Sequence, residues 1–217
     1  MPRSSPALRI AAVTGALYLL LTALVAVHVL DPLDQAVRRW LRPDAVWGPV
    51  QIRAAHVAEG LKPLHVIPLL VVVALLCAVV QRSWRPVVVG GVAAVGTAGL
   101  VVVTKILVAR PDPGDQITSI GGAYPSGHAA VLVAVTGAGL LAIIARPAWW
   151  SWTYPVLGNA VMGYCLAVQS VHWFTDVVGG MLLAFSVLAV SSWLSSQWER
   201  REAHRRPSVA ASVTSVS

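Results

Sequence analysis

The sequence is poor in charge. Only 12% of its 217 residues are Asp, Glu, Lys or Arg, whereas 57% are hydrophobic. A typical soluble domain carries roughly 25% charged residues, which it needs to cover its surface. This shortage argues against a disordered chain and against an ordinary cytosolic enzyme. An integral membrane protein is the class that fits.

The chain also has few cysteines and lacks the common cofactor-binding motifs. The two cysteines, Cys77 and Cys165, both fall inside apolar runs and are expected to be small buried hydrophobic residues. The chain has no HExxH sequence, no P-loop and no Gly-x-Gly-x-x-Gly. We therefore predict no metal and no other cofactor.

The positive net charge of +7 has a simple explanation in a membrane protein. Most basic residues lie at the ends of apolar runs or in the C-terminal tail, where membrane topology and anionic lipids account for them. We therefore expect membrane lipids, and no nucleic acid, as partners. The oligomeric state stays open.

The chain contains long stretches without charged residues. Six gaps of 19 to 30 residues separate consecutive charged residues between Arg9 and Glu199. A helix needs about 20 apolar residues to cross the hydrocarbon core, so the gaps predict an all-α, polytopic membrane protein with six transmembrane helices. The predicted spans are residues 8–30, 64–80, 87–108, 128–146, 154–171 and 176–198.

This pattern also predicts the domain organisation. Residues 1–199 form the six-helix membrane domain, and residues 200–217 form a disordered, basic and Ser-rich tail. The first loop, residues 31–62, contains at 34–41 either a short helix in the membrane interface or a solvated segment.

Orientation follows from the distribution of Lys and Arg. Nine lie on the side that holds both termini, against seven on the other side. The positive-inside rule places both termini in the cytoplasm of a multi-pass cell-membrane protein. The loops after the first, third and fifth spans then face outward.

Two cations mark the end of the third span. Lys105 is followed after four residues by Arg110 and Pro111. A lysine provides a positive charge and an arginine a bidentate fork, and both suit phosphate oxygens. For Lys105 the alternative is snorkelling at a helix end.

A polar turn opens the fourth span. Pro125, Ser126, Gly127 and His128 precede a long apolar run. The free N–H groups of a helix N-terminus bind oxyanions, to which Ser126 can add a hydroxyl and Gly127 a close approach. The alternative is an ordinary serine N-cap.

The third cluster pairs a histidine with a carboxylate. His172 and Asp176 are four residues apart, which places them on one face of a helix. A carboxylate on one ring nitrogen fixes the tautomer and makes the other nitrogen a better nucleophile. His128 could then protonate a leaving oxygen, which is the chemistry of phosphoryl transfer through a phosphohistidine.

These three motifs, in this order on six spans, resemble those of the type 2 phosphatidic acid phosphatase (PAP2) family, which is related to the vanadium haloperoxidases. The resemblance implies that His172 is the nucleophile, Asp176 its partner and His128 the general acid. Phosphate-binding residues would be Lys105, Arg110, Ser126 and Gly127. The family acts without a metal, and its membrane members dephosphorylate lipid phosphates or diphosphates.

One departure from the family pattern concerns the third motif. Its usual serine and arginine are replaced here by Cys165 and Leu166. Losing a donor to a transition state costs on the order of 10²–10³ in rate. Gln169, or Arg53 or Lys62 from the first loop, could supply a substitute donor.

The sequence thus predicts an outer-face lipid phosphatase that acts on an isoprenoid or glycerolipid phosphate or diphosphate. Two alternatives remain: a non-catalytic lipid-phosphate binder or scaffold, for which Leu166 argues, and a lipid phosphotransferase. A small transporter or channel is disfavoured, because most spans lack an internal charge.

Overall fold

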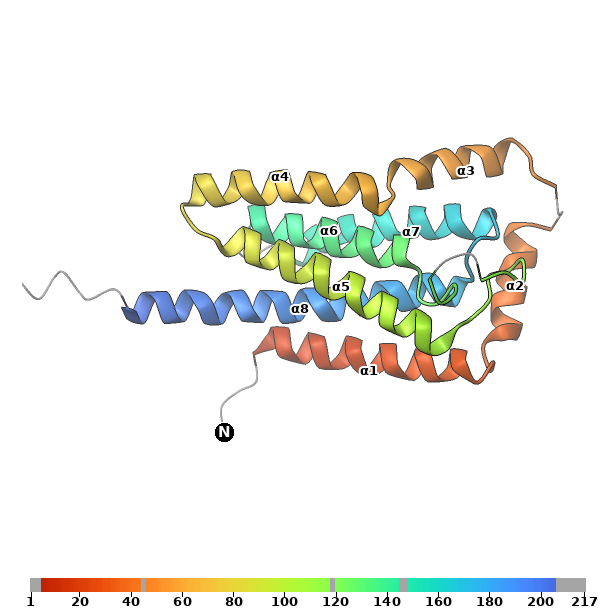
Figure 1. The fold of residues 1–217 in the computed structure, drawn as a ribbon, viewed down its shortest axis with the longest axis horizontal. Coiled ribbons are helices and arrows are strands. Elements are labelled where there is room, and N and C mark those ends of the chain that lie inside the picture. Colours follow the sequence, from red (N-terminus) through yellow and green to blue (C-terminus); the bar gives the residue numbers. More distant parts are fainter. Residues whose placement is uncertain (1–4, 44–45, 118–119, 145–147, 206–217) are drawn as a thin grey trace, which may run out of the picture.

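The computed structural model describes residues 5–43, 46–117, 120–144 and 148–205. Every regular element in these ranges is helical, which gives an all-α fold (Figure 1). The elements are α1 (Pro6–Ala26), α2 (Asp31–Leu41), α3 (Pro49–Gly60), α4 (Pro63–Gln81), α5 (Arg85–Val108), α6 (Gly127–Ile143), the 3₁₀ turn η1 (Trp149–Trp152), α7 (Thr153–Val168) and α8 (Phe174–Arg205).

Proline sets the start of five of these helices. A proline occupies the first turn of each helix from α1 to α5, where its missing N–H has no intrahelical partner to lose. Serine caps two helix starts: Ser5 accepts a hydrogen bond from Leu8 N, and Ser126 accepts one from Ala129 N.

Each of the six predicted spans contains a helix, and the chain is a multi-pass membrane protein. In the described ranges, four segments are long and apolar enough to cross a bilayer, namely Pro6–Ala26, Pro49–Gln81, Arg85–Val108 and Phe174–Trp198. The prediction of six transmembrane helices is therefore supported only in part. The two shorter helices are α6, with 17 residues, and α7, with 16. A 17-residue helix is about 26 Å long, less than the ~30 Å hydrocarbon core.

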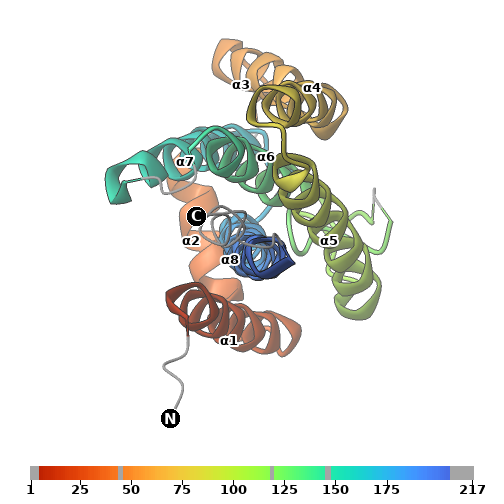
Figure 2. The same ribbon diagram turned by 90° about the vertical axis from the view of Figure 1, so that its left-hand side faces the viewer.

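Helix α6 forms the centre of the bundle. Most of its residues are buried, and it packs against α4, α5, α7 and α8. Ala and Gly make up much of its sequence and allow the neighbouring helices to approach closely. Figure 2 looks along the bundle and shows α6 between α7 and α5, with α1 packed against α8 on the other side.

The first loop contains two helices rather than one. The expected helix at residues 34–41 is present as α2, which runs across one end of the bundle (Figure 1). Its only buried side chain is that of Asp34. Helix α3 follows and leads into α4, and the two together form the 33-residue apolar segment.

The C-terminal boundary differs from the prediction. Helix α8 continues to Arg205, so the first six residues of the predicted tail at 200–217 are helical. The strong helix formers after Trp198, mainly Glu, Arg and Ala, explain the extension. The rest of the tail lies outside the described residues.

Candidate active site

The three sequence clusters meet at the end of the bundle that α2 crosses. The backbone N–H of Ser126 donates to the carbonyl of Asp176 (2.9 Å), and Ala123 N donates to the carbonyl of Arg110 (2.7 Å). Arg110 in turn contacts the Asp176 side chain. Segments far apart in the sequence are thus joined by direct hydrogen bonds.

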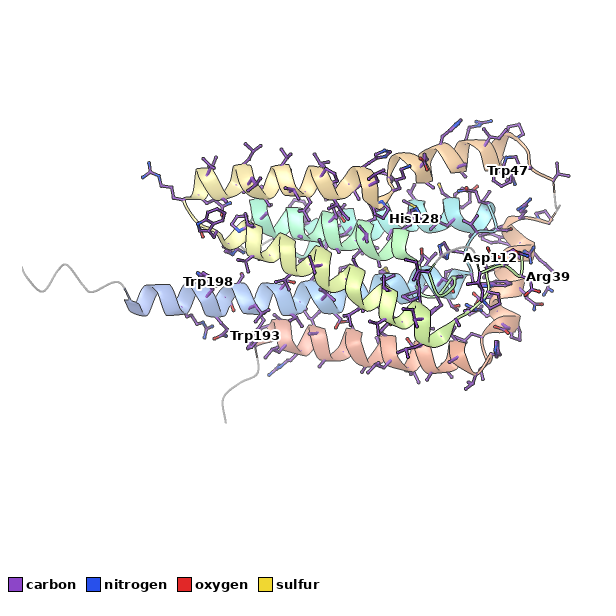
Figure 3. All side chains as sticks on the ribbon, in the orientation of Figure 1. Arg39, Trp47, Asp112, His128, Trp193 and Trp198 are labelled. Carbon is purple, nitrogen blue, oxygen red and sulfur yellow. The ribbon has the colours of Figure 1, made fainter. Side chains whose placement is uncertain are left out.

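A cleft of about 770 Å³ lies among these segments, and we call it the histidine cleft. Four of the predicted site residues line it: Lys105, Gly127, His128 and His172. Figure 3 shows His128 and Asp112, another lining residue, at this end of the bundle. Its apolar wall is formed by side chains of α4, α5, α6 and α7, among them Ile67, Val101, Val102, Val131 and Leu166. Arg110, Ser126 and Asp176 are not among its lining residues.

His172 and Asp176 form the expected pair. His172 Nδ1 lies 3.3 Å from Asp176 Oδ2, which suits the tautomer with the proton on Nδ1. Asp176 is fully buried in the first turn of α8, and its Oδ2 also accepts a hydrogen bond from Trp173 N (2.9 Å). This arrangement leaves Nε2 of His172 as the nitrogen with a lone pair.

The backbone around Asp176 can pack this closely because two glycines follow it. A Cβ atom at Gly179 would lie 2.6 Å from the ring of Tyr124, and one at Gly180 would lie 2.6 Å from the carbonyl oxygen of Ser126. Even alanine would therefore displace the start of α6 from α8. Burial raises the pKa of Tyr124, so this phenol stays neutral where it packs on α8.

Lys105 lies in the last turn of α5 and is buried. Its Nζ donates to the carbonyl of Gly122. Gly122 has a φ of +119°, and a Cβ there would lie 2.4 Å from the carbonyl oxygen of Arg110. The loop therefore folds tightly back on the end of α5 and holds Lys105 beside the cleft.

Arg110 has different surroundings. Its Nη1 donates to Thr175 Oγ1 (2.8 Å) and Asp176 Oδ1 (2.9 Å). Its Nη2 donates to Asp31 Oδ1 (3.1 Å) and Asp34 Oδ2 (2.7 Å). These five residues are here called the Arg110 cluster. Burial works to lower the pKa of Arg110, but Asp176 and Asp34 outweigh it and raise that pKa, so the guanidinium stays charged.

Ser126 and Gly127 have separate places at the start of α6. The Ser126 side chain is buried and caps the helix by accepting from Ala129 N (3.4 Å), which is the ordinary N-cap role. Gly127 lines the cleft. The amide groups of this first turn therefore remain the feature of α6 best suited to an oxyanion.

Leu166, which replaces the usual arginine of the third motif, lies on the wall of the cleft. Its side chain is 3% exposed and lines the histidine cleft. Gln169 also lines the cleft, but its Nε2 donates to the carbonyl of Cys165 (2.8 Å). From the first loop, α3 brings His56 and Glu59 to the cleft, whereas Arg53 and Lys62 are not among the lining residues.

Asp34 and Thr175 are members of the Arg110 cluster that the sequence did not reveal. Both are buried, and they contact each other across 141 residues of chain. A carboxylate in the longest polar stretch has no local feature that distinguishes it. Within the described residues, no group of three or more His, Cys, Asp or Glu side chains is arranged to hold a metal ion.

Comparisons with known proteins bear on the fold. No protein-family model matches the chain, and no curated protein sequence does. A solved structure is similar: the crystal structure of the first transmembrane PAP2 type phosphatidylglycerolphosphate phosphatase, from Bacillus subtilis. It superimposes with a TM-score of 0.70 at 16% sequence identity, over 90% of this chain and 98% of that one. The fold is PAP2-like. The resemblance predicted from the three motifs is therefore confirmed at the level of the fold.

Proposed function

We propose that this PAP2-like protein is an integral-membrane lipid phosphatase that works through a phosphohistidine, without a metal. The observation that carries the proposal is one cleft that contains His172, His128 and Lys105, with Asp176 held against His172 from behind. A nucleophile, an acid and a cation at one site are what phosphoryl transfer requires.

The reaction has two steps. In the first, Nε2 of His172 attacks phosphorus, the bond from phosphorus to the lipid oxygen breaks, and His128 donates its proton to that oxygen. In the second, water attacks the phosphohistidine, the N–P bond breaks, and His128 takes a proton from the water. Phosphate leaves and both histidines return to their starting state.

The charge on the transferred group needs stabilisation. Lys105 and the first-turn amides of α6, at Gly127 and His128, are the groups nearest the cleft that can provide it. Direct contacts of phosphate with Ser126 and Arg110 stay predictions, since Ser126 caps α6 and the Arg110 fork contacts carboxylates.

The substrate is an isoprenoid or glycerolipid phosphate or diphosphate. The cleft has a polar end at the histidines and an apolar wall on α4, α5 and α6, which suits a lipid with an anionic head group. The second candidate function is a non-catalytic binder or scaffold. Leu166 favours it, because this residue places an apolar side chain on the cleft wall, where a cation would assist catalysis.

Phosphate release from a panel of lipid phosphates and diphosphates, with EDTA present, tests the proposal. We expect release by the purified protein, unaffected by EDTA, and release at background level for His172→Ala. The control is His65→Ala, which removes an exposed histidine that does not line the cleft. Equal release by His172→Ala and the parent would leave only the binder, and transfer of labelled phosphate to a lipid acceptor would identify a phosphotransferase.

The proposed topology has its own test. Both termini are proposed to be cytoplasmic, which places the histidine cleft at the outer face of the cell membrane. Ile120 is 69% exposed in the loop beside the cleft. A cysteine there should react with an impermeant thiol reagent in intact cells, at a rate above that of the parent chain. Labelling only after lysis would invert the orientation.

A further inference from the structure

The carboxylate of Asp34 is a buried charged group that has no part in the proposed reaction. Asp34 lies in the first turn of α2 and is 1% exposed. A carboxylate taken out of water needs partners, because an unpaired buried charge is strongly destabilising. Its three hydrogen bonds come from Thr175 N (2.9 Å), Thr175 Oγ1 (2.5 Å) and Arg110 Nη2 (2.7 Å).

Both partners of Asp34 also hold Asp176. Thr175 precedes Asp176 in the chain, so its peptide N–H fixes the backbone at the start of α8. Arg110 bridges the two carboxylates, with Nη2 on Asp34 and Nη1 on Asp176 Oδ1 (2.9 Å). Because Oδ1 of Asp176 is occupied by Arg110, Oδ2 is the oxygen that faces His172.

The burial pattern of α2 indicates that the contact of Asp34 with Arg110 and Thr175 does more than pack the helix against the bundle. A helix that docks for hydrophobic stabilisation buries an apolar stripe. Here Asp34 is the only buried residue of α2, and Leu33 and Trp40 are exposed. Two carboxylates of α2, the buried Asp34 and the partly exposed Asp31, accept hydrogen bonds from Arg110 behind the His172–Asp176 pair, and of these only Asp34 also contacts Thr175.

We infer that Asp34 is a positioning residue for the proposed reaction: it fixes Arg110 and Thr175, and through them holds Asp176 in the orientation that makes His172 nucleophilic. Asp34 is not among the residues that line the histidine cleft. The inference rests on the proposed function, but the state of His172 can be measured without turnover.

The test compares Asp34→Asn with Asp115→Asn in the full-length protein. The Asp115→Asn substitution removes the same charge from the neighbouring loop. The backbone at this position has a φ of +62°, which asparagine tolerates. Two quantities are measured: kcat and KM on a lipid phosphate, and the rate at which diethyl pyrocarbonate modifies His172, followed by peptide mass spectrometry.

For Asp34→Asn we expect kcat to fall by roughly 10- to 100-fold, the range seen when a residue that orients a ligating histidine is lost. KM should change less than about twofold, and His172 modification should slow by a similar factor to kcat. Asp115→Asn should match the parent. A folded Asp34→Asn protein with the parent's kcat, or with an effect on KM alone, would overturn the inference.

A second pair of variants decides the question if Asp34→Asn does not fold. Thr175→Val keeps the side-chain shape and loses the hydroxyl that donates to Asp34, whereas Thr175→Ser keeps the hydroxyl. We expect slow His172 modification in Thr175→Val and recovery in Thr175→Ser, and equal rates would overturn the inference. If the parent shows no hydrolysis, the proposed function fails, and the modification rates alone decide the role of Asp34.

Discussion

The histidine cleft and the Arg110 cluster lie on opposite sides of Asp176, and they treat their polar groups differently. In the cleft, His172 uses Nδ1 for Asp176, while half-buried His128 lines the same space beside Lys105. In the cluster, the two terminal nitrogens of Arg110 make four hydrogen bonds, three of them to carboxylates. One region has polar groups on the wall of an open cleft, and the other satisfies its groups by internal hydrogen bonds.

In the proposed function, this difference gives the nucleophilic histidine a fixed orientation. A side chain on the wall of an open cleft has fewer packing partners than a buried one, so His172 gains order from a partner outside the cleft. Buried charge pairs give such an anchor because breaking them is costly. Asp176 serves both regions, with Oδ1 in the cluster and Oδ2 on the histidine.

The largest effect should come from Asp176→Asn, which breaks both regions together. The amide cannot accept from Arg110 and pair with the Nδ1–H of His172 in the native way. We expect activity to fall by about 10³-fold or more, as when the orienting aspartate of a catalytic triad becomes asparagine. Stability should fall by about 3 kcal/mol, because a buried charge loses its partner.

Phosphate release and thermal unfolding in detergent measure the two effects of Asp176→Asn. Asp115→Asn controls for the loss of one negative charge at this end of the bundle. Native activity in a folded Asp176→Asn protein would mean that His172 does not depend on the carboxylate.

Arg110→Lys separates the two cations. Lysine keeps the charge but loses the fork that joins Asp34 to Asp176. We expect kcat to fall by roughly 10- to 100-fold through loss of orientation, and inhibition by inorganic phosphate to change less than about twofold. Lys105→Met should instead weaken inhibition by about tenfold or more, the value of one charged hydrogen bond.

Inhibition constants for inorganic phosphate, measured on both variants, test this contrast. If Arg110→Lys weakens inhibition as much as Lys105→Met, Arg110 reaches the phosphate directly, as the motif resemblance implies.

Leu166→Arg should increase the activity of the histidine cleft. The side chain lines the cleft, so a guanidinium there would lie beside the histidines. We expect kcat/KM on a generic lipid phosphate to rise by about tenfold, part of the 10²–10³ that one transition-state donor is worth. Leu166→Met controls for the packing change, because Leu166 is also part of the core.

Steady-state kinetics on a lipid monophosphate and a lipid diphosphate measure this gain. An unchanged rate in folded Leu166→Arg protein would mean that another group already fills the position of the missing arginine.

The smallest effect should come from Glu59→Gln at the edge of the cleft. Glu59 is exposed and pairs with Lys62, one turn along. Removing a negative charge near an anionic head group should raise kcat/KM about twofold at low salt, and the gain should vanish at high salt. Glu59→Asp keeps the charge and serves as the control, and a loss of activity above about tenfold would instead assign Glu59 a direct role in the reaction.

The sequence predicted the fold well because a bilayer leaves few choices. A long uncharged stretch inside a bilayer has to contain a helix, so each of the six predicted spans contains one, with ends that agree to within four residues except at the C-terminal end of α8. The lengths of α6 and α7 were not predictable in the same way. Helix α6 is mostly buried among its neighbours, and that burial depends on the packing of the whole bundle.

The site was predictable only where its residues lie close in sequence. His172 and Asp176, four residues apart, do pair, although His172 lies in the bend before α8 and not on the helix face that the spacing predicted. The role of Arg110 was harder, since a cation near a helix end suits phosphate and carboxylate equally. Its partner Asp34 lies 76 residues away, and no local pattern indicates a contact over that distance.

The Asp34–Thr175 contact also bears on how the chain matures during synthesis. The two residues are separated by 141 positions, and α1 packs against α8, the last helix in the part of the chain that the structure describes. At roughly 5–20 residues per second, Asp34 waits about 7 to 30 s for its partner. Arg110 is made 76 residues after Asp34 and can pair with it earlier, but the two hydrogen bonds from Thr175 are missing throughout that interval. A ribosome-bound chain that stops before α8 should therefore lack the contacts that fix both Asp34, which has no Thr175, and His172, which has no Asp176.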